Sequence, residues 1–193
     1  MDFQKTIDKE EMAKMPREVF PGQIVVVNTE KALMHAIAEL SSYTEIGFDT
    51  ETRPNFTKDT HHKISLMQLS TNHTCFLIRL NHFKKMPPKL KSFLKNKEIK
   101  KIGLSLRDDF NGLQHLTTIS PDSFIDLQDY VGQFGIEELS LRKIYAIVFG
   151  KRISKSKQKS NWDLPVLSKP QMLYAALDAW SCLHIYQHLE QSK

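Results

Sequence analysis

The sequence is poor in cysteine and contains no long apolar run. Its only cysteines, Cys75 and Cys182, are too few for a disulfide scaffold and lack the paired spacing of a zinc site. We therefore expect both to be reduced and buried. The longest apolar stretches, such as Ile24 to Val27, fall far short of the roughly 20 residues that cross a bilayer. This absence excludes a membrane-spanning helix and argues against a membrane partner.

Other common signals are also missing. The amino terminus mixes acids and bases and has no apolar core of signal-peptide length. We therefore expect an intracellular location, either cytoplasmic or associated with nucleic acid. The chain has no glycine-rich phosphate loop, and its histidines, including His73 and His82, lack the paired spacing of zinc ligands. A formal charge of +5 and a pI near 9.1 favour an anionic partner, although many basic proteins of this size bind no nucleic acid.

The chain is long enough for one domain with a sizeable core. It has 193 residues, of which 40% are hydrophobic and 25% charged. Pro21-Gly22 is a turn signal that precedes a run of β-branched residues. The pattern predicts an N-terminal extension over residues 1–21 and one domain over residues 22–193.

Strand and helix patterns alternate along that domain. Thr29 is a plausible helix cap, and Ser105 is predicted to cap a helix over residues 105–116. Predicted strands cover residues 24–27, 45–49, 64–68, 75–78, 99–104 and, weakly, 124–125. Further helices are predicted near residues 33–40, 88–96, 127–134, 138–149 and 171–189. The economical assembly is an α/β fold with a mixed sheet flanked by helices.

Two carboxylates stand at the end of the predicted strand 45–49. Strand alternation directs Asp49 and Glu51 to the same side, with Thr50 facing away. Two acids so placed could share a cation, but an isolated Asp-x-Glu is more often a solvated pair.

A second pair lies near the carboxyl terminus. Tyr174 and Asp178 are spaced i, i+4, so on a helix they share one face. Ala175, Ala176 and Ala179 would let that helix approach a sheet closely. An isolated pair of this kind is usually a core tyrosine beside an exposed acid, whereas Asp49 and Glu51 together with it favour a metal site.

Between these motifs, the Ile102 to Asp109 segment runs from a predicted strand into a helix that bears two acids. With Phe48 to Glu51 and Tyr174 to Asp178, it resembles the three motifs of the DEDD exonuclease family in order and spacing. The similarity is to the tyrosine branch, which includes ribonuclease D, because Leu173 replaces the histidine of the other branch.

The resemblance extends over roughly residues 22–190 and is greatest to the exonuclease domains of the Werner syndrome helicase type. It includes Ser140-Leu141, Gly150-Lys151, Ser160-Asn161-Trp162 and the run from Gln171 to Glu190. It implies a ribonuclease-H-like fold, with a mixed central sheet and helices on both faces. It also implies a 3′→5′ exonuclease, a phosphodiester hydrolase that releases nucleoside 5′-monophosphates from DNA or RNA.

The same resemblance implies a site for two Mg²⁺ or Mn²⁺ ions. Asp49 would bridge both ions, Glu51 and Asp178 would complete the nucleophile side, and Asp109 would serve the leaving-group side. Asp108 would be a bystander or an outer-shell residue. Tyr174 would orient the attacking water, because a tyrosine with a pKa near 10 is a poor base at neutral pH.

Several other residues are candidates for contact with nucleic acid. Phe56 could stack on the terminal base or close the core edge. The acid-free basic segment 151–160 could track phosphates or be a solvated loop, and its candidates are Arg152, Lys155, Lys157 and Lys159. Lys84 to Lys97 is a second basic stretch, for which we favour a solvated helix face. Trp162 is predicted to anchor its loop by packing.

An alternative to the enzyme is a catalytically inactive nucleic-acid-binding module with the same fold. Such a module would be expected to lose at least one motif residue, whereas all five are present here. The expected partners are single-stranded or recessed 3′ ends. No helicase lies on this chain, so an unwinding partner would be a separate protein. The sequence does not indicate a preference for DNA or RNA, or the oligomeric state.

Overall fold

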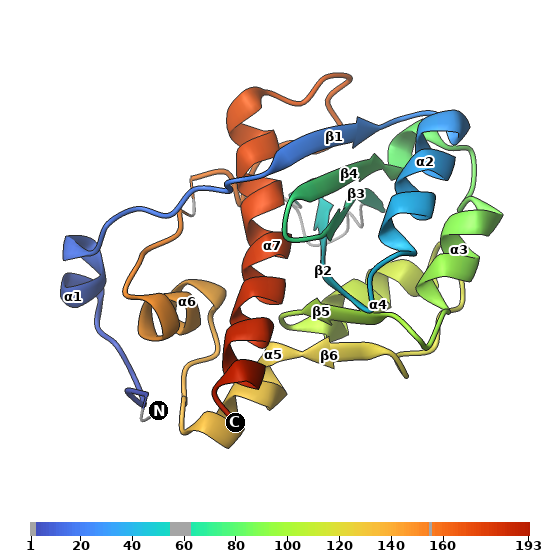
Figure 1. The fold of residues 1–193 in the computed structure, drawn as a ribbon. Coiled ribbons are helices and arrows are strands. Elements are labelled where there is room, and N and C mark those ends of the chain that lie inside the picture. The colour runs from blue at the N-terminus through green and yellow to red at the C-terminus, as the bar shows by residue number, and fades with distance from the viewer. Residues whose placement is uncertain (1–2, 55–62, 155) are drawn as a thin grey trace.

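A six-stranded mixed β-sheet forms the centre of the molecule, and helices cover both of its faces (Figure 1). The computed structural model describes residues 3–54, 63–154 and 156–193. The strands are β1 (Gln23–Val27), β2 (Glu45–Thr52), β3 (Ile64–Ser70), β4 (Thr74–Arg79), β5 (Lys100–Gly103) and β6 (Phe124–Asp126). The predicted α/β class with a mixed sheet is confirmed.

The strand order is β1-β4-β3-β2-β5-β6, so β2 lies between β3, which runs antiparallel to it, and β5, which runs parallel to it. β2, β3 and β4 form the predicted antiparallel meander, whereas β5 and β6 run parallel to β2. Because parallel strands end at the same edge of a sheet, residues that follow β2 and β5 gather there.

Each helix predicted from the apolar periodicity is present. The helices are α1 (Lys9–Lys14), α2 (Glu30–Leu40), α3 (Pro88–Leu94), α4 (Leu106–Gln114), α5 (Leu127–Tyr130), α6 (Leu141–Phe149) and α7 (Lys169–Gln191), with 3-10 turns η1 (Leu80–His82) and η2 (Val131–Phe134). The Thr29 hydroxyl caps α2 as predicted, accepting from the Ala32 N–H at 3.2 Å. Within the described ranges, no helix combines the length and apolar character that a membrane span requires.

Helix α7 lies directly against β2. A Cβ atom at Gly47 would stand 1.9 Å from the carbonyl oxygen of Ala179, so only glycine fits at this point of the strand. Ala175, Ala176 and Ala179 are fully buried on the helix, as expected for the close approach that these small residues predicted. Helices α2, α3 and α4 pack a second apolar layer on the opposite face.

The turn from β5 into α4 differs from the prediction. Ser105 has a φ of 60° and its hydroxyl caps nothing. Asp126, at the end of β6, accepts instead from the backbone N–H groups of Ser105 at 2.9 Å and Leu106 at 2.7 Å. The predicted Ser105 cap is therefore wrong, because the left-handed turn exposes these N–H groups to a carboxylate on the neighbouring strand.

The segment before β1 is docked on the domain. Ile7 and Met12 are buried against Ala146 of α6. Farther along, the backbone of residues 16–18 pairs with Arg152 through two hydrogen bonds, Arg152 N–H to Pro16 at 3.0 Å and Glu18 N–H to the Arg152 carbonyl at 2.9 Å. The N-terminal segment before β1, which we call the strap, therefore crosses the chain that follows α6 (Figure 1).

Candidate metal centre

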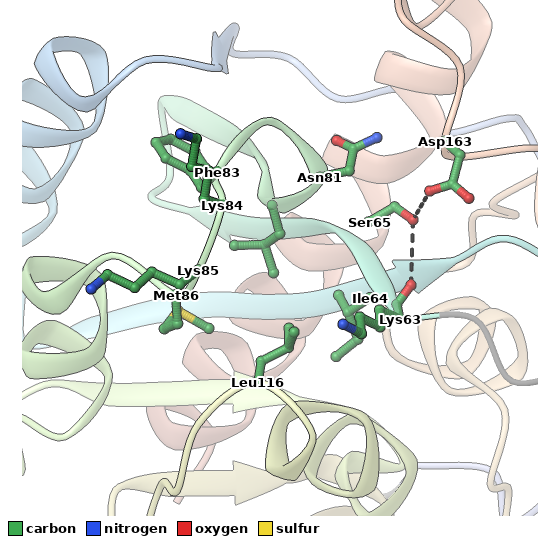
Figure 2. A pocket seen from close by; sticks show the side chains of 11 residues that line it. Lys63, Ile64, Ser65, Asn81, Phe83, Lys84, Lys85, Met86, Leu116 and Asp163 are labelled. Atoms are coloured by element: carbon green, nitrogen blue, oxygen red, sulfur yellow. Dashed lines mark hydrogen bonds between the residues drawn. The ribbon is translucent and has the colours of Figure 1, made fainter.

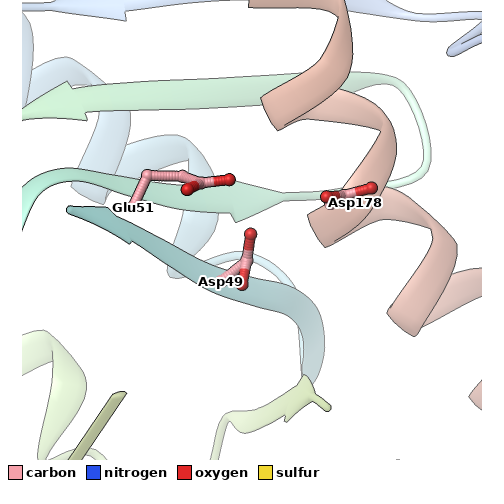
Figure 3. A group of neighbouring side chains, drawn as sticks. All are labelled: Asp49, Glu51 and Asp178. Atoms are coloured by element: carbon pink, nitrogen blue, oxygen red, sulfur yellow. The ribbon is translucent and has the colours of Figure 1, made fainter. Parts of the chain in front are cut away.

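Three carboxylates from two elements meet at the sheet edge where β2 ends. Asp49 and Glu51 project from the same side of β2, as strand alternation predicted, and Asp178 projects toward them from α7 (Figure 3). One oxygen atom from each carboxylate lies within 4.8 Å of the other two. All three residues are half-buried, so the cluster is accessible but partly withdrawn from water.

The cluster lies in a pocket of about 370 Å³. Its walls come from the β5–α4 turn, the start of α6 and the segment after α6, with Ser105, Arg142 and Ser154 among the lining residues. Tyr174 and Cys182 lie on the α7 side. Segments far apart in the sequence thus converge around the carboxylates.

Burial and mutual repulsion disfavour the ionised form of these acids. Desolvation raises the pKa of Asp49 well above its usual value, and the charges of Glu51, Asp109 and Asp178 add to that effect. Desolvation and the charges of Asp178 and Asp109 raise the pKa of Glu51 to about 9. Desolvation raises the pKa of Asp178 to about 7, against the contact with the Tyr174 hydroxyl, which lowers it. A cation would relieve this repulsion, and oxygen ligands of this kind suit a hard divalent ion.

Asp109 is held close to the cluster by a neighbour of Asp49. The hydroxyl of Thr50, which lies between Asp49 and Glu51 on β2, donates a hydrogen bond to Asp109 of α4. Desolvation raises the pKa of Asp109 to about 7, and the Thr50 hydrogen bond acts in the opposite direction. Asp109 does not belong to the group of three, while the adjacent Asp108 is exposed.

Tyr174 lies one helical turn before Asp178 and is buried beside it. Desolvation raises the pKa of the Tyr174 hydroxyl above its usual value, and the charges of Asp178 and Glu51 raise it further. The Tyr174 ring lies 6.2 Å from that of Trp162, centroid to centroid. Trp162 is fully buried, which confirms the prediction that it anchors its loop by packing.

Sequence reasoning missed Gln68. It is fully buried on β3 opposite Asp49, and its Nε2 donates to Asp49 Oδ2 at 3.1 Å. Its Oε1 has no hydrogen-bond partner among the described residues. A polar amide inside the apolar run of β3 was the available signal, but the strand register that places it beside Asp49 is visible only in the fold.

The structure describes three of the five residues predicted to contact nucleic acid. Phe56 and Lys155 lie outside the described residues. Arg152 and Lys159 are exposed, and Lys157 is half-buried. Ser154 and Gln158, from the same segment, line the carboxylate pocket, so the basic loop passes along its rim.

The sheet order and the helical layers define an α/β fold of the ribonuclease-H-like class. The exonuclease domain of Nibbler from Aedes aegypti has this fold, with a TM-score of 0.77 and 23% identity over 97% of this chain and 92% of that chain. RNase D from Escherichia coli superposes with a TM-score of 0.75 and 22% identity over 86% of this chain and 45% of that chain.

The model of the 3′-5′ exonuclease family matches residues 24–192, and the chain belongs to that family. A similar curated protein is the mouse bifunctional 3′-5′ exonuclease/ATP-dependent helicase WRN, which is 32% identical over 91% of this chain and 13% of its own length. A putative 3′-5′ exonuclease, R431 of Acanthamoeba polyphaga mimivirus, is 30% identical over 75% of this chain and 39% of its own length. The chain therefore spans less than half of the length of these two relatives.

Proposed function

We propose that this chain is a metal-dependent 3′→5′ exonuclease that releases nucleoside 5′-monophosphates from the 3′ end of a nucleic acid. The observation that carries the proposal is the convergence of Asp49, Glu51 and Asp178 in one pocket of a member of the exonuclease family. We also propose residues 22–193 as the exonuclease domain, with residues 1–21 as its extension.

We propose two Mg²⁺ or Mn²⁺ ions as cofactors, held by Asp49, Glu51, Asp178 and Asp109. When bound, such ions lower the pKa of water and neutralise the charge that develops on the phosphate and the departing oxygen. The carboxylates fit this role because they supply hard oxygen donors and repel one another without a cation. Gln68 fixes the orientation of Asp49 through its amide hydrogen bond.

Tyr174 acts in this proposal by positioning a water molecule. Its raised pKa keeps the hydroxyl protonated at neutral pH, so it donates or shares a hydrogen bond and does not remove a proton. Its place one turn from Asp178 brings the hydroxyl to the edge of the carboxylate cluster. The four acids bind the cations, and Tyr174 aligns the nucleophile beside them.

The substrate is the 3′ end of DNA or RNA, single-stranded or recessed. A Trypanosoma brucei RNase D that was solved with RNA U12 supports an RNA end, and mouse WRN, which combines an exonuclease with a helicase, supports ends that need unwinding. We propose that unwinding of duplex ends, where needed, comes from a helicase outside the described chain.

The test uses DNA and RNA strands labelled at either end. With Mg²⁺ or Mn²⁺, a 5′-labelled strand should shorten stepwise, whereas a 3′-labelled strand should release labelled mononucleotide at once. EDTA should stop both reactions. Tight binding without cleavage under every metal condition would favour the inactive binding module instead, and release of mononucleotide from the 5′ end would contradict the polarity.

A further inference from the structure

Three arginines line a small pocket beside the carboxylate pocket. Arg17 comes from the N-terminal strap, Arg142 from α6 and Arg152 from the chain after α6, and the pocket has a volume of about 190 Å³. Arg142, with Ile153 and Ser154, also lines the carboxylate pocket. The two pockets are therefore neighbours that share a wall.

The backbone brings two of these cations together. Arg17 and Arg152 are partners in an isolated parallel β-bridge between the strap and the chain after α6. The hydrogen bonds on either side of the bridge, to Pro16 and from Glu18, are 3.0 and 2.9 Å long. Main-chain pairing thus holds like charges side by side, an arrangement that electrostatics alone would oppose.

Two of the guanidinium groups are anchored by one edge only. Nε of Arg142 donates to the Ile153 carbonyl at 3.1 Å, and Nε of Arg152 donates to the Met15 carbonyl at 3.0 Å. Within the described ranges, the terminal nitrogens of these groups make no hydrogen bond to protein, and neither does the Arg17 side chain. Each anchored fork is pre-oriented and keeps N–H donors available for a ligand.

The nearby acid does not neutralise this cluster. The Glu18 carboxylate accepts from Lys151 Nζ at 2.8 Å and from the Tyr145 hydroxyl at 3.0 Å. Among the residues that the structure describes, none of the three arginines forms an ion pair. The pocket therefore presents positive charge without a protein counter-ion.

A second basic pocket of the molecule shows the contrast. Lys63, Lys84 and Lys85 border a pocket of about 350 Å³ near the end of β4 (Figure 2). That pocket already contains an acid, Asp163, which accepts a hydrogen bond from Ser65. Its cations are lysines, which carry a point charge on a flexible stem, whereas arginine forks match the oxygen pairs of a phosphate.

We propose that Arg17, Arg142 and Arg152 form a phosphate-binding subsite next to the carboxylate pocket. The inference rests on the proposed exonuclease function and extends it to a phosphate other than the one that is cleaved. The ligand is either a backbone phosphate of the bound strand or the phosphate of a free nucleoside monophosphate. Both present the same oxygens to the forks, and the experiment distinguishes them.

The experiment measures binding in EDTA, where no cleavage is expected. The double variant Arg17→Gln, Arg152→Gln is compared with wild type on a 5′-fluorescein-labelled strand of twelve nucleotides, by anisotropy over a range of salt. We expect about tenfold weaker binding and a salt slope that falls by about 0.7 for each lost phosphate contact. Arg152→Lys keeps the charge but loses the fork, so its affinity for the strand should lie between those of wild type and the double variant.

Two further ligands identify the source of the phosphate. A dinucleoside monophosphate labelled on a base contains only the phosphate to be cleaved, and a nucleoside 5′-monophosphate is a free product. If the subsite binds the strand, the double variant should lose affinity for the long strand but not for the dinucleoside monophosphate. A product subsite predicts weaker competition by the monophosphate. Unchanged binding of all ligands by the double variant would overturn the proposal.

The matched control combines Lys89→Gln on α3 with Lys95→Gln at the C-cap of that helix, and it removes the same charge from exposed positions across the sheet (Figure 1). An equal loss of strand affinity in this control would mean that net charge alone explains the effect, and it would overturn the subsite. Arg17→Gln alone removes no side-chain hydrogen bond of the described residues, so it tests the subsite if the double variant melts early. If wild type cleaves the strand and the arginine variants bind it as tightly as wild type, only the subsite is contradicted. If the arginine variants bind the strand more weakly but wild type does not cleave it, only the exonuclease function is contradicted.

Discussion

The carboxylate pocket and the arginine pocket share a wall but are built in opposite ways. The acids project from β2 and α7, two elements pressed together in the core, and their positions follow from side-chain packing. Arg17 and Arg152 project from the strap and a connecting segment, which main-chain hydrogen bonds hold together, and Arg142 projects from α6. Packing in the core thus holds the repelling carboxylates together, whereas backbone pairing at the periphery brings two of the repelling arginines together. The comparison teaches that chemistry and binding can be separated by mutation.

The largest expected effect comes from removing an acid of the core. Asp178→Ala should lower the exonuclease rate by about 10⁴-fold or more, because the ions lose an essential ligand. Without metal, its melting temperature should equal or exceed that of wild type, since one repelling charge is gone. Asp108→Asn, an exposed acid on α4, is the control and should keep the wild-type rate. Wild-type turnover by Asp178→Ala would exclude this residue as a ligand.

A smaller loss is expected at Tyr174. The Phe variant keeps the ring that packs near Trp162 but removes the hydroxyl beside Asp178. Single-turnover cleavage at saturating metal should slow by about 10²- to 10⁴-fold, the usual effect of losing a group that orients or exchanges a proton. Metal and strand affinities should change little. If the single-turnover rate stayed at the wild-type value, Tyr174 would be only a core aromatic.

A substitution at Gln68 tests whether a hydrogen bond from the neighbouring strand affects metal binding by Asp49. Gln68→Leu retains the volume but removes the donor to Asp49, so the metal concentration for half-maximal rate should rise about 10- to 100-fold. The rate at saturating metal should recover most of its wild-type value. Gln114→Leu, the same change at an exposed position, is the control. An unchanged metal titration would show that Asp49 does not depend on this hydrogen bond.

The basic loop at the pocket rim should act on binding. Lys157→Gln with Lys159→Gln should raise the KM for a long strand roughly threefold and flatten its salt dependence, because fewer phosphate contacts release fewer counterions. The kcat should change less than the KM. A salt slope identical to that of wild type would identify the loop as solvated surface.

The smallest expected effect is on stability and pH in the absence of metal. The pKa values of Asp178 and Asp109 are raised to about 7 and that of Glu51 to about 9, so the folded state holds more protons than the unfolded state above pH 4. Stability is therefore greatest below the unfolded values near pH 4 and is lost as the pH rises through 7 and then 9. The melting temperature in EDTA should fall by at least roughly 5 °C from pH 5 to pH 9.

Two comparisons check that assignment. Mg²⁺ should restore the melting temperature at pH 9, and Asp178→Asn should flatten the decline between pH 5 and pH 7. A melting temperature in EDTA that rises over the same range would mean that other groups dominate the pH dependence.

The sequence predicted what depends on local periodicity. Strand alternation placed Asp49 and Glu51 on one side of β2, and helical spacing placed Tyr174 beside Asp178. The features that it missed depend on pairing between distant segments. Gln68 meets Asp49 through the register of β3, Asp126 replaces Ser105 as the cap of α4, and Arg17 meets Arg152 across the strap. These contacts need the assembled fold, because no short-range pattern encodes them.

The contact between Gly47 and Ala179 gives the protein a spacer of fixed length between its central strand and its last helix. Asp49 and Asp178 each lie close in sequence to that contact, on opposite sides of the gap that it sets. Mg²⁺ binds oxygen at about 2.0–2.1 Å, whereas Ca²⁺ needs about 2.3–2.6 Å and more ligands. A side chain at position 47 would push α7 away from β2 and widen the gap between Asp49 and Asp178, and distances this short leave little tolerance for such a change. The spacing of the two carboxylates therefore depends on a residue that has no side chain.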